Sequence, residues 1–212
     1  MNLEVIIPAY NEEMRIAEVI RPLKSSDYID KIVVVNDGST DETAQIAADE
    51  GADLILNHTS NMGKGAALET GIKRIKGKFF LIVDADLRNL KEDHIRLMVS
   101  KFNEGKNTVM VNGIIKKEAP IQSDIQKFIT GVRLISKDVW QEAEKEDIKK
   151  GYEIDLLIYE KAKNLGEIKT EVLEGLEHTS KIDKEGFFRG VFRHIGMFIE
   201  IIYRTIIRKV RK

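Results

Sequence analysis

Two carboxylates stand one residue apart at the end of an apolar run. Asp84 and Asp86 follow residues 79–83, whose composition predicts a strand buried on both faces of a parallel sheet. An unpaired charge is costly in an apolar interior, so the strand must end near Asp84, with both acids at its C-terminal tip. Ligands bind at this edge of open α/β sheets, and paired carboxylates there suit a divalent cation that holds a diphosphate. A helix N-cap followed by a solvated turn acid is the alternative.

Two earlier motifs also contain residues suited to binding a nucleotide. Asp37 ends a β-branched strand and can accept hydrogen bonds from a base or a ribose, although Asp37-Gly38 is also a common turn pair. Gly63-Lys64-Gly65 lets backbone approach a ligand and places Lys64 at a helix N-terminus. An ordinary helix start with a solvated lysine explains the same residues. The loop matches neither the phosphate-binding loop of NTPases nor the dinucleotide fingerprint.

Two further candidates come late in the chain. Asp155 begins a predicted helix, where an acid is either a solvated complement of the helix dipole or a general base. His178 follows a predicted strand and is either a metal ligand or an ordinary polar residue.

The elements that must position these residues alternate between strand and helix. We expect strands at 3–7, 32–35, 54–56, 79–83, 108–111, 130–136 and 168–173, with Pro8 closing the first. We expect helices from the Asn11 cap to Leu23, from Thr40 or Asp41 to Gly51, and at about 64–75, 90–102, 138–146 and 153–164. This order predicts right-handed βαβ units in a mostly parallel sheet. Four of the strands end in polar loops, and at one sheet edge these loops form a binding crevice.

Composition limits the class of protein. The chain has 212 residues with a formal net charge of −1, which fits one domain with or without an appendage and gives no indication of nucleic acid binding. It has no cysteine, which excludes disulfides, thiolate catalysis and cysteine zinc sites. Because no signal peptide and no apolar stretch of about 20 residues is evident, we expect a soluble cytoplasmic protein.

The C-terminal residues differ in charge from the rest. Residues 189–212 hold seven basic residues against Glu200, and on a helical wheel the charges gather on one face opposite aromatic and aliphatic residues. Such a basic amphipathic helix binds an anionic membrane surface, forms an oligomer contact, or packs on its own domain. The membrane interpretation places the protein on the periphery of the inner membrane face and favours a lipid-linked acceptor.

Four motifs in register resemble family 2 glycosyltransferases with the GT-A fold. They are Pro8-Ala9-Tyr10-Asn11-Glu12, Val35-Asn36-Asp37-Gly38-Ser39-Thr40-Asp41, Asn61-Met62-Gly63-Lys64-Gly65-Ala66-Ala67 and Asp84-Ala85-Asp86. The resemblance implies a Rossmann-like three-layer α/β/α domain over 1–183, with a nucleotide-sugar half at 1–111 and an acceptor half at 112–183. The amphipathic helix then occupies 184–212.

The resemblance also implies metal-dependent, inverting transfer of a hexose from a UDP- or GDP-sugar to an acceptor hydroxyl of unknown identity. By position, the implied nucleotide-sugar site comprises Pro8, Ala9, Tyr10, Glu12, Asp37, Gly63, Lys64, Asp84, Ala85 and Asp86. Asp37 would hold the base, Asp84 would contact the ribose, and Asp86 with His178 would bind Mg²⁺ or Mn²⁺. The metal and Lys64 would stabilise charge on the leaving nucleoside diphosphate.

The chain departs from the family pattern at the expected base. Many members carry Glu-Asp before this helix, where this chain has Ile154-Asp155 with Glu153 one position earlier. We assign the base to Asp155 and keep Glu153 as the alternative. Residues 130–133 resemble the segment that closes the acceptor side, which makes Gly131 and Arg133 acceptor-side candidates. The Gln-x-x-Arg-Trp signature of processive synthases is absent, so we expect a single transfer.

Two other functions are compatible with the same motifs. A nucleotide-sugar-binding module without turnover would keep Asp86 and lack the usual Glu-Asp pair. A sugar nucleotidyltransferase would carry a basic glycine-rich loop after the first strand, where this chain has Pro8-Ala9-Tyr10-Asn11-Glu12. A homodimer is a further expectation, because the C-terminal helix offers an apolar face.

Overall fold

The structure is a computed structural model that describes residues 3–115, 130–145 and 153–178. Contacts within the chain separate residues 1–177 from residues 178–212, and of the second segment the described residues include His178 alone. The predicted C-terminal helix at 184–212 and the predicted loop around Pro120 therefore lie outside the described residues.

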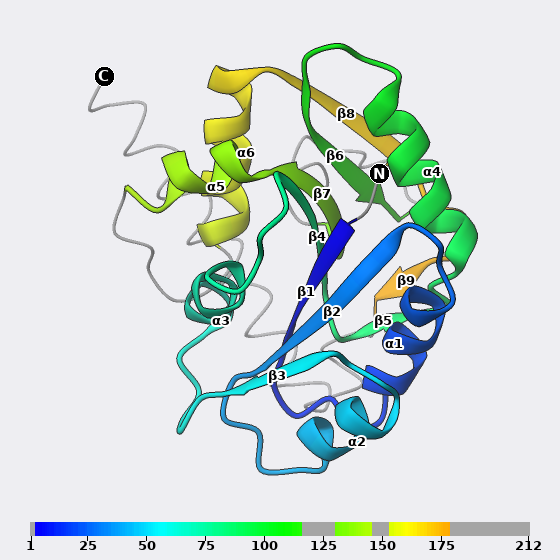
Figure 1. Cartoon of the computed structure of the whole chain (residues 1–212), viewed down its shortest axis with the longest axis vertical. Coiled ribbons are helices and arrows are strands. Elements are labelled where there is room, and N and C mark those ends of the chain that lie inside the picture. Colours follow the sequence, from blue (N-terminus) through cyan, green and yellow to red (C-terminus); the bar gives the residue numbers. More distant parts are fainter. Residues whose placement is uncertain (1–2, 116–129, 146–152, 179–212) are drawn as a thin grey trace, which may run out of the picture. The chain divides into compact units, whose positions relative to one another are not determined.

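A central sheet organises the described part of the chain (Figure 1). Its strand order is β3-β2-β1-β4-β7-β6-β8. The strands are β1 (Leu3–Ala9), β2 (Ile29–Asn36), β3 (Leu54–Asn57), β4 (Phe79–Val83), β6 (Thr108–Ile114), β7 (Val132–Ser136) and β8 (Glu167–Val172). A separate pair is formed by β5 (Leu87–Arg88) and β9 (Glu177–His178). All seven strands of the sheet were expected from the sequence, whereas the short β5–β9 pair was not.

The sheet is parallel in its first half and mixed in its second. The strands β3, β2, β1 and β4 pair in parallel, so their C-terminal ends meet at one edge, as predicted. β7 pairs antiparallel with both β4 and β6, and β8 pairs parallel with β6. The prediction of a mostly parallel α/β sheet is confirmed.

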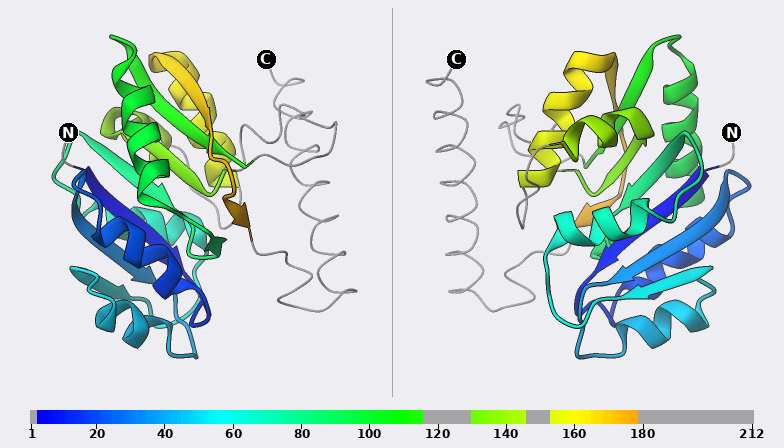
Figure 2. Two further views of the ribbon diagram at one scale, coloured as in Figure 1. Left: turned by 90° about the vertical axis from the view of Figure 1, so that its right-hand side faces the viewer. Right: turned by 60° about the vertical axis from the view of Figure 1, so that its left-hand side comes forward.

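Helices cover both faces of this sheet. They are α1 (Ile16–Lys24), α2 (Thr43–Asp49), α3 (Lys64–Ile72), α4 (Glu92–Asn103), α5 (Lys137–Ala143) and α6 (Glu153–Leu165). In Figure 1, α1, α2 and α4 lie on one side of the sheet and α3, α5 and α6 on the other, and the second group comes forward in the right panel of Figure 2. The predicted three-layer arrangement is confirmed.

The two faces bury separate apolar clusters because side chains alternate along each strand. Val5 and Ile7 of β1 pack in the cluster beneath α1 and α4, and the intervening Ile6 packs in the cluster beneath α3, α5 and α6. Trp140 of α5, 1% exposed, is the largest fully buried side chain among the described residues. A shift of one residue in a strand's register would therefore move the side chains of each cluster to the opposite face, where they do not fit the packing.

Two local expectations were wrong. Pro8 does not close β1, because the strand pairs with β2 as far as Ala9. Its missing N–H disturbs no pairing with β4, since that ladder ends at Ile6. Asn11 does not cap α1, which begins at Ile16. Asn11 adopts a φ of 54° and joins a neighbouring loop instead.

Two element ends also differ from the prediction. The helix expected to run to Ile75 ends at Ile72, because Arg74 and Ile75 form i→i+3 turns. β6 continues to Ile114 through a stretch that we expected to be loop, and this places Asn112 inside the sheet. No helix within the described ranges is long and apolar enough to cross a bilayer.

Candidate functional site

The loops after β1 and β2 hold each other through side chains that accept from backbone N–H groups. The Asn11 N–H donates to Ser39 Oγ at 3.0 Å, and Asn11 Oδ1 accepts from the Thr40 N–H at 2.9 Å. The Glu12 N–H donates to Thr43 Oγ1 at 2.8 Å. These bonds fix the segment 8–12 against the segment 35–43.

Asp37 links the end of β2 to the glycine-rich loop. Its Oδ1 accepts from the Met62 N–H at 2.9 Å, and its Oδ2 accepts from the Gly63 N–H at 2.7 Å. His58 Nδ1 lies 2.6 Å from Asp37 Oδ1, and His58 Nε2 lies 2.9 Å from Thr70 Oγ1. Asp37 is 3% exposed, and its buried carboxylate holds the backbone of the glycine-rich loop in place.

Two glycines make the close approach of these loops possible. Gly38 has a φ of +73°, and a Cβ there would lie 2.5 Å from the Ser60 carbonyl carbon. Gly63 precedes α3 with a φ of 91°. Both positions require the left-handed backbone conformations that side chains disfavour.

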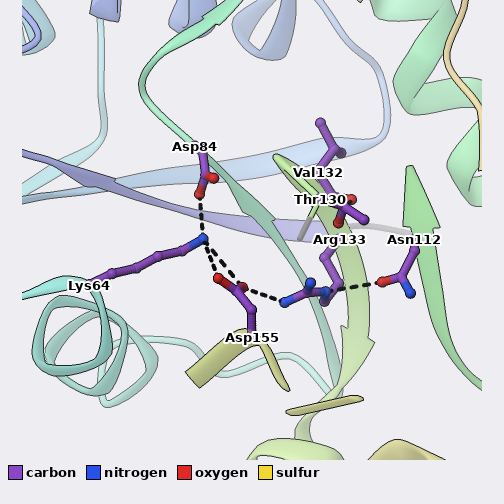
Figure 3. Close-up of polar contacts among 7 residues, drawn as sticks. All are labelled: Lys64, Asp84, Asn112, Thr130, Val132, Arg133 and Asp155. Atoms are coloured by element: carbon purple, nitrogen blue, oxygen red, sulfur yellow. Dashed lines mark hydrogen bonds and ion pairs between the residues drawn. The ribbon is translucent and has the colours of Figure 1, made fainter. Parts of the chain in front are cut away.

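Lys64, the first residue of α3, lies between two carboxylates from distant parts of the chain (Figure 3). Its Nζ is 2.8 Å from Asp84 Oδ1, at the end of β4. It is also 3.1 Å from Asp155 Oδ2, in the first turn of α6. The lysine therefore connects the end of β4 with α6, the helix that carries the predicted base.

A second cation holds Asp155 from its other side. Arg133 Nη1 of β7 donates to Asp155 Oδ1 at 2.6 Å, and Arg133 Nε donates to Asn112 Oδ1 at 3.0 Å. Arg133 and Asp155 are each 1% exposed. The neighbouring Gly131 carbonyl accepts from the Asp84 N–H at 2.8 Å, so β7 also fixes the backbone at the tip of β4.

The electrostatics of this cluster keep its groups charged. Burial is the largest single influence and favours the neutral forms of both Lys64 and Asp155, but the opposite charges around each group together outweigh it. The pKa of Lys64 is raised, with further help from Asp84. The pKa of Asp155 is lowered by Lys64 and then by Arg133.

Asp84, Asp86 and His178 offer ligand atoms suited to a divalent metal. One oxygen of each carboxylate and one ring nitrogen of His178 all lie within 4.8 Å of one another. Carboxylate oxygens suit Mg²⁺ and Mn²⁺, and imidazole is compatible with Mn²⁺. A set of three protein ligands leaves positions for phosphate oxygens, so the residues present fit such a metal.

The other predicted residues lie around this edge. Pro8 and Ala9 end β1, Tyr10 is 45% exposed, and Glu12 and Ala85 are 8% and 3% exposed. Glu153 is the first residue of α6, and its side chain is not among those the structure describes. The structure thus brings Lys64, Asp84, Asp155 and Arg133 into direct contact, while Asp37 braces the loop that carries Lys64.

Sequence reasoning missed two residues of this arrangement. His58 directly follows β3, so its position at the same strand edge as Asp37 was an available signal. Asn112 gave no such signal, because the strand pattern weakened before it. Its role depends on a pairing with β7 in which Asn112 stands opposite Arg133.

Solved structures share this fold. Glucosyl-3-phosphoglycerate synthase from Mycobacterium tuberculosis, in complex with Mn²⁺, UDP and glucosyl-3-phosphoglycerate, superposes with a TM-score of 0.71 at 22% identity, covering 87% of this chain and 75% of that one. Its complex with Mg²⁺ and UDP gives 0.72 at 21% identity, covering 86% and 73%. The chain therefore has the GT-A fold of glycosyltransferases.

The sequence places the chain in a family. The family model "Glycosyl transferase family 2" matches residues 4–153. The chain belongs to glycosyltransferase family 2, as its motifs predicted, and it carries a glycosyltransferase domain of that family.

Several curated proteins are similar over part of their length. A dolichyl-phosphate beta-glucosyltransferase of Trichomonas vaginalis is 30% identical over 147 residues, which is 60% of this chain and 45% of that protein. An uncharacterized protein of Methanocaldococcus jannaschii is 37% identical over 116 residues, or 53% and 47%. The 4,4'-diaponeurosporenoate glycosyltransferase of Staphylococcus aureus is 33% identical over 104 residues, or 47% and 28%. The chain thus spans less than half the length of these relatives.

Proposed function

We propose that this chain transfers a hexose from a nucleoside diphosphate sugar to an acceptor, with a divalent metal at Asp84 and Asp86. The observation that carries the proposal is the convergence at one sheet edge of this acid pair and Lys64. The edge lies at the C-terminal ends of parallel strands, where α/β proteins bind nucleotides. Family membership supports the same activity.

The residues around the acid pair suggest how the donor is held. Asp37, with the loop it braces, is the proposed contact for the base, and the segment from Pro8 to Glu12 lines the nucleotide pocket. Asp86 and His178 complete the proposed metal site with Asp84. A bound Mg²⁺ or Mn²⁺ would neutralise the diphosphate that departs, and the Lys64 ammonium would add a second positive charge there.

The donor nucleotide is UDP or GDP in this proposal. UDP is supported by its presence in solved structures that share the fold. Inversion at the sugar carbon and a single transfer per acceptor remain parts of the proposal, from the motif resemblance. The division of the domain between residues 111 and 112 into a donor half and an acceptor half is also part of the proposal.

Asp155 as general base requires a rearrangement of its contacts. Both of its oxygens bind cations, and its pKa is lowered, which makes it a weak proton acceptor. For Asp155 to deprotonate an acceptor hydroxyl, Lys64 must first leave it. Glu153, two residues before Asp155 at the start of α6, remains the alternative base.

An acceptor that carries phosphate is a second candidate, and the contacts of Asp155 favour it. A phosphate monoester is already ionised near pH 7 and needs no base to attack the sugar carbon. The similarity to a protein named dolichyl-phosphate beta-glucosyltransferase supports a lipid-linked phosphate. The basic helix predicted at 184–212 supports a membrane surface as the place of transfer. Alternatively, its apolar face forms the contact of a homodimer.

A transfer assay on the full chain tests the proposal. Labelled UDP- and GDP-sugars are incubated with Mn²⁺ and either polyprenyl phosphate or polyprenol in detergent, and the lipid product is identified by mass spectrometry. We expect transfer from one donor, lowered at least about 100-fold in Asp86→Ala. The matched control is Asp93→Ala, an exposed acid of α4 (69% exposed), which should keep full transfer.

The same assay separates the two acceptors and the non-catalytic alternative. If a hydroxyl is the acceptor and Asp155 the base, Asp155→Asn stops transfer at saturating metal. If phosphate is the acceptor, Asp155→Asn still transfers. Donor binding without transfer to either lipid or to hydroxyl-bearing small acceptors would leave a nucleotide-sugar-binding module. Release of pyrophosphate from a nucleoside triphosphate and a sugar phosphate would identify a nucleotidyltransferase.

A further inference from the structure

Lys64 is partly buried and ion-paired. Its side chain is 17% exposed, and its Nζ contacts Asp84 at 2.8 Å and Asp155 at 3.1 Å. Figure 3 shows the side chain extending from α3 into the space between these two carboxylates. A lysine needed only for a departing diphosphate would not have to contact a carboxylate of the metal site.

The cluster is balanced in charge before any metal binds. Two cations, Lys64 and Arg133, face two anions, Asp84 and Asp155, through the ion pairs of Figure 3. Asp84 is one of the proposed metal ligands, so one ligand of that site already neutralises an internal cation.

A metal that reaches Asp84 meets this fixed ammonium. Charges in a partly buried site interact more strongly than in water, so the repulsion opposes metal binding. A diphosphate brings negative charge to both the metal and the Lys64 ammonium, and this offsets the repulsion between them. Metal and nucleotide should therefore bind much more tightly together than separately, and this coupling must be reciprocal.

We propose that Lys64 is the internal counter-ion of the metal site and makes divalent metal binding depend on the nucleoside diphosphate. The inference rests on the proposed function, because it assumes the metal at Asp84 and Asp86. Asp155 and Arg133 act as positioning residues: Asp155 contacts the lysine, and Arg133 in turn holds Asp155. Asp155 thereby draws the ammonium away from Asp84 and partly offsets its charge.

This arrangement gives two variants of the same ion pair opposite effects. Lys64→Met keeps most of the side-chain volume and removes the cation, so metal should bind more tightly without nucleotide. Asp155→Asn keeps the shape and removes an anion, so the ammonium repels metal more strongly. A purely structural role for the Lys64–Asp155 pair would weaken metal binding in both variants.

The experiment is an Mn²⁺ titration of the full chain, followed by the electron paramagnetic resonance signal of unbound Mn²⁺. It is run without nucleotide and with a saturating amount of UDP or GDP, whichever raises the melting temperature. In the wild type we expect the nucleotide to tighten Mn²⁺ binding at least about 10-fold. The matched control is Lys73→Met, an exposed lysine at the end of the same helix (68% exposed), which should bind as the wild type does.

For Lys64→Met we expect Mn²⁺ alone to bind about 10-fold more tightly than in the wild type, with the nucleotide effect reduced to about 2-fold. For Asp155→Asn we expect Mn²⁺ alone to bind more weakly. Thermal melts verify that each variant is folded, and Lys64→Gln replaces Lys64→Met if the latter does not fold. A wild type whose Mn²⁺ affinity is the same with and without nucleotide overturns the inference, as does weaker binding of Mn²⁺ alone by Lys64→Met. If the wild type binds no Mn²⁺ even with nucleotide, the proposed function fails first, and the inference with it.

Discussion

The two sides of the candidate site are held together by different interactions. On the donor side, the loops after β1, β2 and β3 are joined mainly by side-chain oxygens that accept from backbone N–H groups, as Asp37 does from Met62 and Gly63. On the side of β6, β7 and α6, a buried ion pair between Arg133 and Asp155 makes the central contact. Lys64 is the residue that touches both sides.

The difference matters because the two kinds of contact respond differently to change. Backbone N–H groups stay in place when one acceptor is altered, so the donor-side loops should tolerate single substitutions with moderate loss. A buried charge that loses its partner is left uncompensated, which strongly destabilises the fold. The donor side should thus be robust, and the other side should depend on few residues.

The largest expected effect is on the ion-paired side. Arg133→Met removes one of the two cations that bind buried Asp155, together with the hydrogen bond from Arg133 Nε to Asn112 Oδ1, so the free energy of unfolding should fall by about 3–5 kcal/mol. Urea denaturation measures it. The control is Arg96→Met, in which a 55% exposed arginine loses its ion pair with Asp93. This variant should change stability by less than about 1 kcal/mol. Equal effects of the two variants would contradict the comparison.

A backbone test on the donor side should give a slightly smaller loss. Gly38→Ala combines a φ of +73° with a Cβ placed 2.5 Å from backbone of Ser60, and should cost about 3 kcal/mol. Gly175→Ala has a similar φ of +79° with no atom within 4 Å of the added Cβ, and should cost only about 1 kcal/mol. Thermal or urea unfolding compares the pair, and a Gly38→Ala protein as stable as Gly175→Ala would show that the two loops are not in close contact.

A milder change to the donor-side loops is Asp37→Asn. The amide keeps one oxygen for the Met62 or Gly63 N–H and loses the other, so we expect about 2 kcal/mol of destabilisation. Asp49→Asn, on the exposed surface of α2 where Asp49 accepts from Gln45, should stay within about 0.5 kcal/mol of the wild type. If Asp37→Asn cost as much as Arg133→Met, the distinction between the two sides would be lost.

The smallest expected effect is a pH dependence at His94 of α4. Its Nδ1 accepts from the Lys91 N–H, and its Nε2 lies 3.1 Å from the Glu174 carbonyl oxygen. Burial lowers the pKa of His94, Lys91 adds to this, and the Glu174 carbonyl and Asp93 oppose it. The folded protein therefore binds a proton less readily than the unfolded chain.

The consequence is a stability that is fully present above the unfolded pKa of about 6.5 and declines as the pH falls through that value. A single histidine contributes at most about 1.4 kcal/mol per pH unit. Unfolding of the wild type and His94→Gln is compared at neutral and mildly acidic pH. The wild type should lose more stability than the variant, and parallel losses would exclude His94 as the source.

The sequence was most informative where structure is local. The strands and helices from Leu3 to Val83 follow from apolar runs and turn residues, because each βαβ unit is complete within a short segment. Asp37, Asp84 and Asp86 were found because each comes at or near the C-terminal end of a parallel strand, and Lys64 was found because a glycine-rich loop places it at a helix N-terminus. The role of the Asn11 side chain was predicted wrongly. An asparagine that caps a helix cannot be distinguished by sequence from one that accepts a hydrogen bond from a distant loop, as Asn11 does from Thr40.

Contacts between distant segments could not be predicted in the same way. Lys64 and Asp155 are 91 positions apart, and their contact depends on how α3 and α6 pack on the same face of the sheet. The antiparallel insertion of β7 between β4 and β6 sets Arg133 opposite Asn112. A strand pattern does not encode its neighbours, so the buried ion pair emerged only from the fold.

The central claim is that the acid pair forms a metal-dependent nucleotide site. A thermal-shift screen of UDP, GDP and their sugars, with and without Mn²⁺, tests it most directly, because a ligand that binds only the folded state raises the melting temperature. We predict a rise with one nucleotide that needs the metal and disappears in Asp86→Ala but not in Asp93→Ala. No rise with any of these nucleotides, or a rise that Asp86→Ala leaves intact, would contradict the claim.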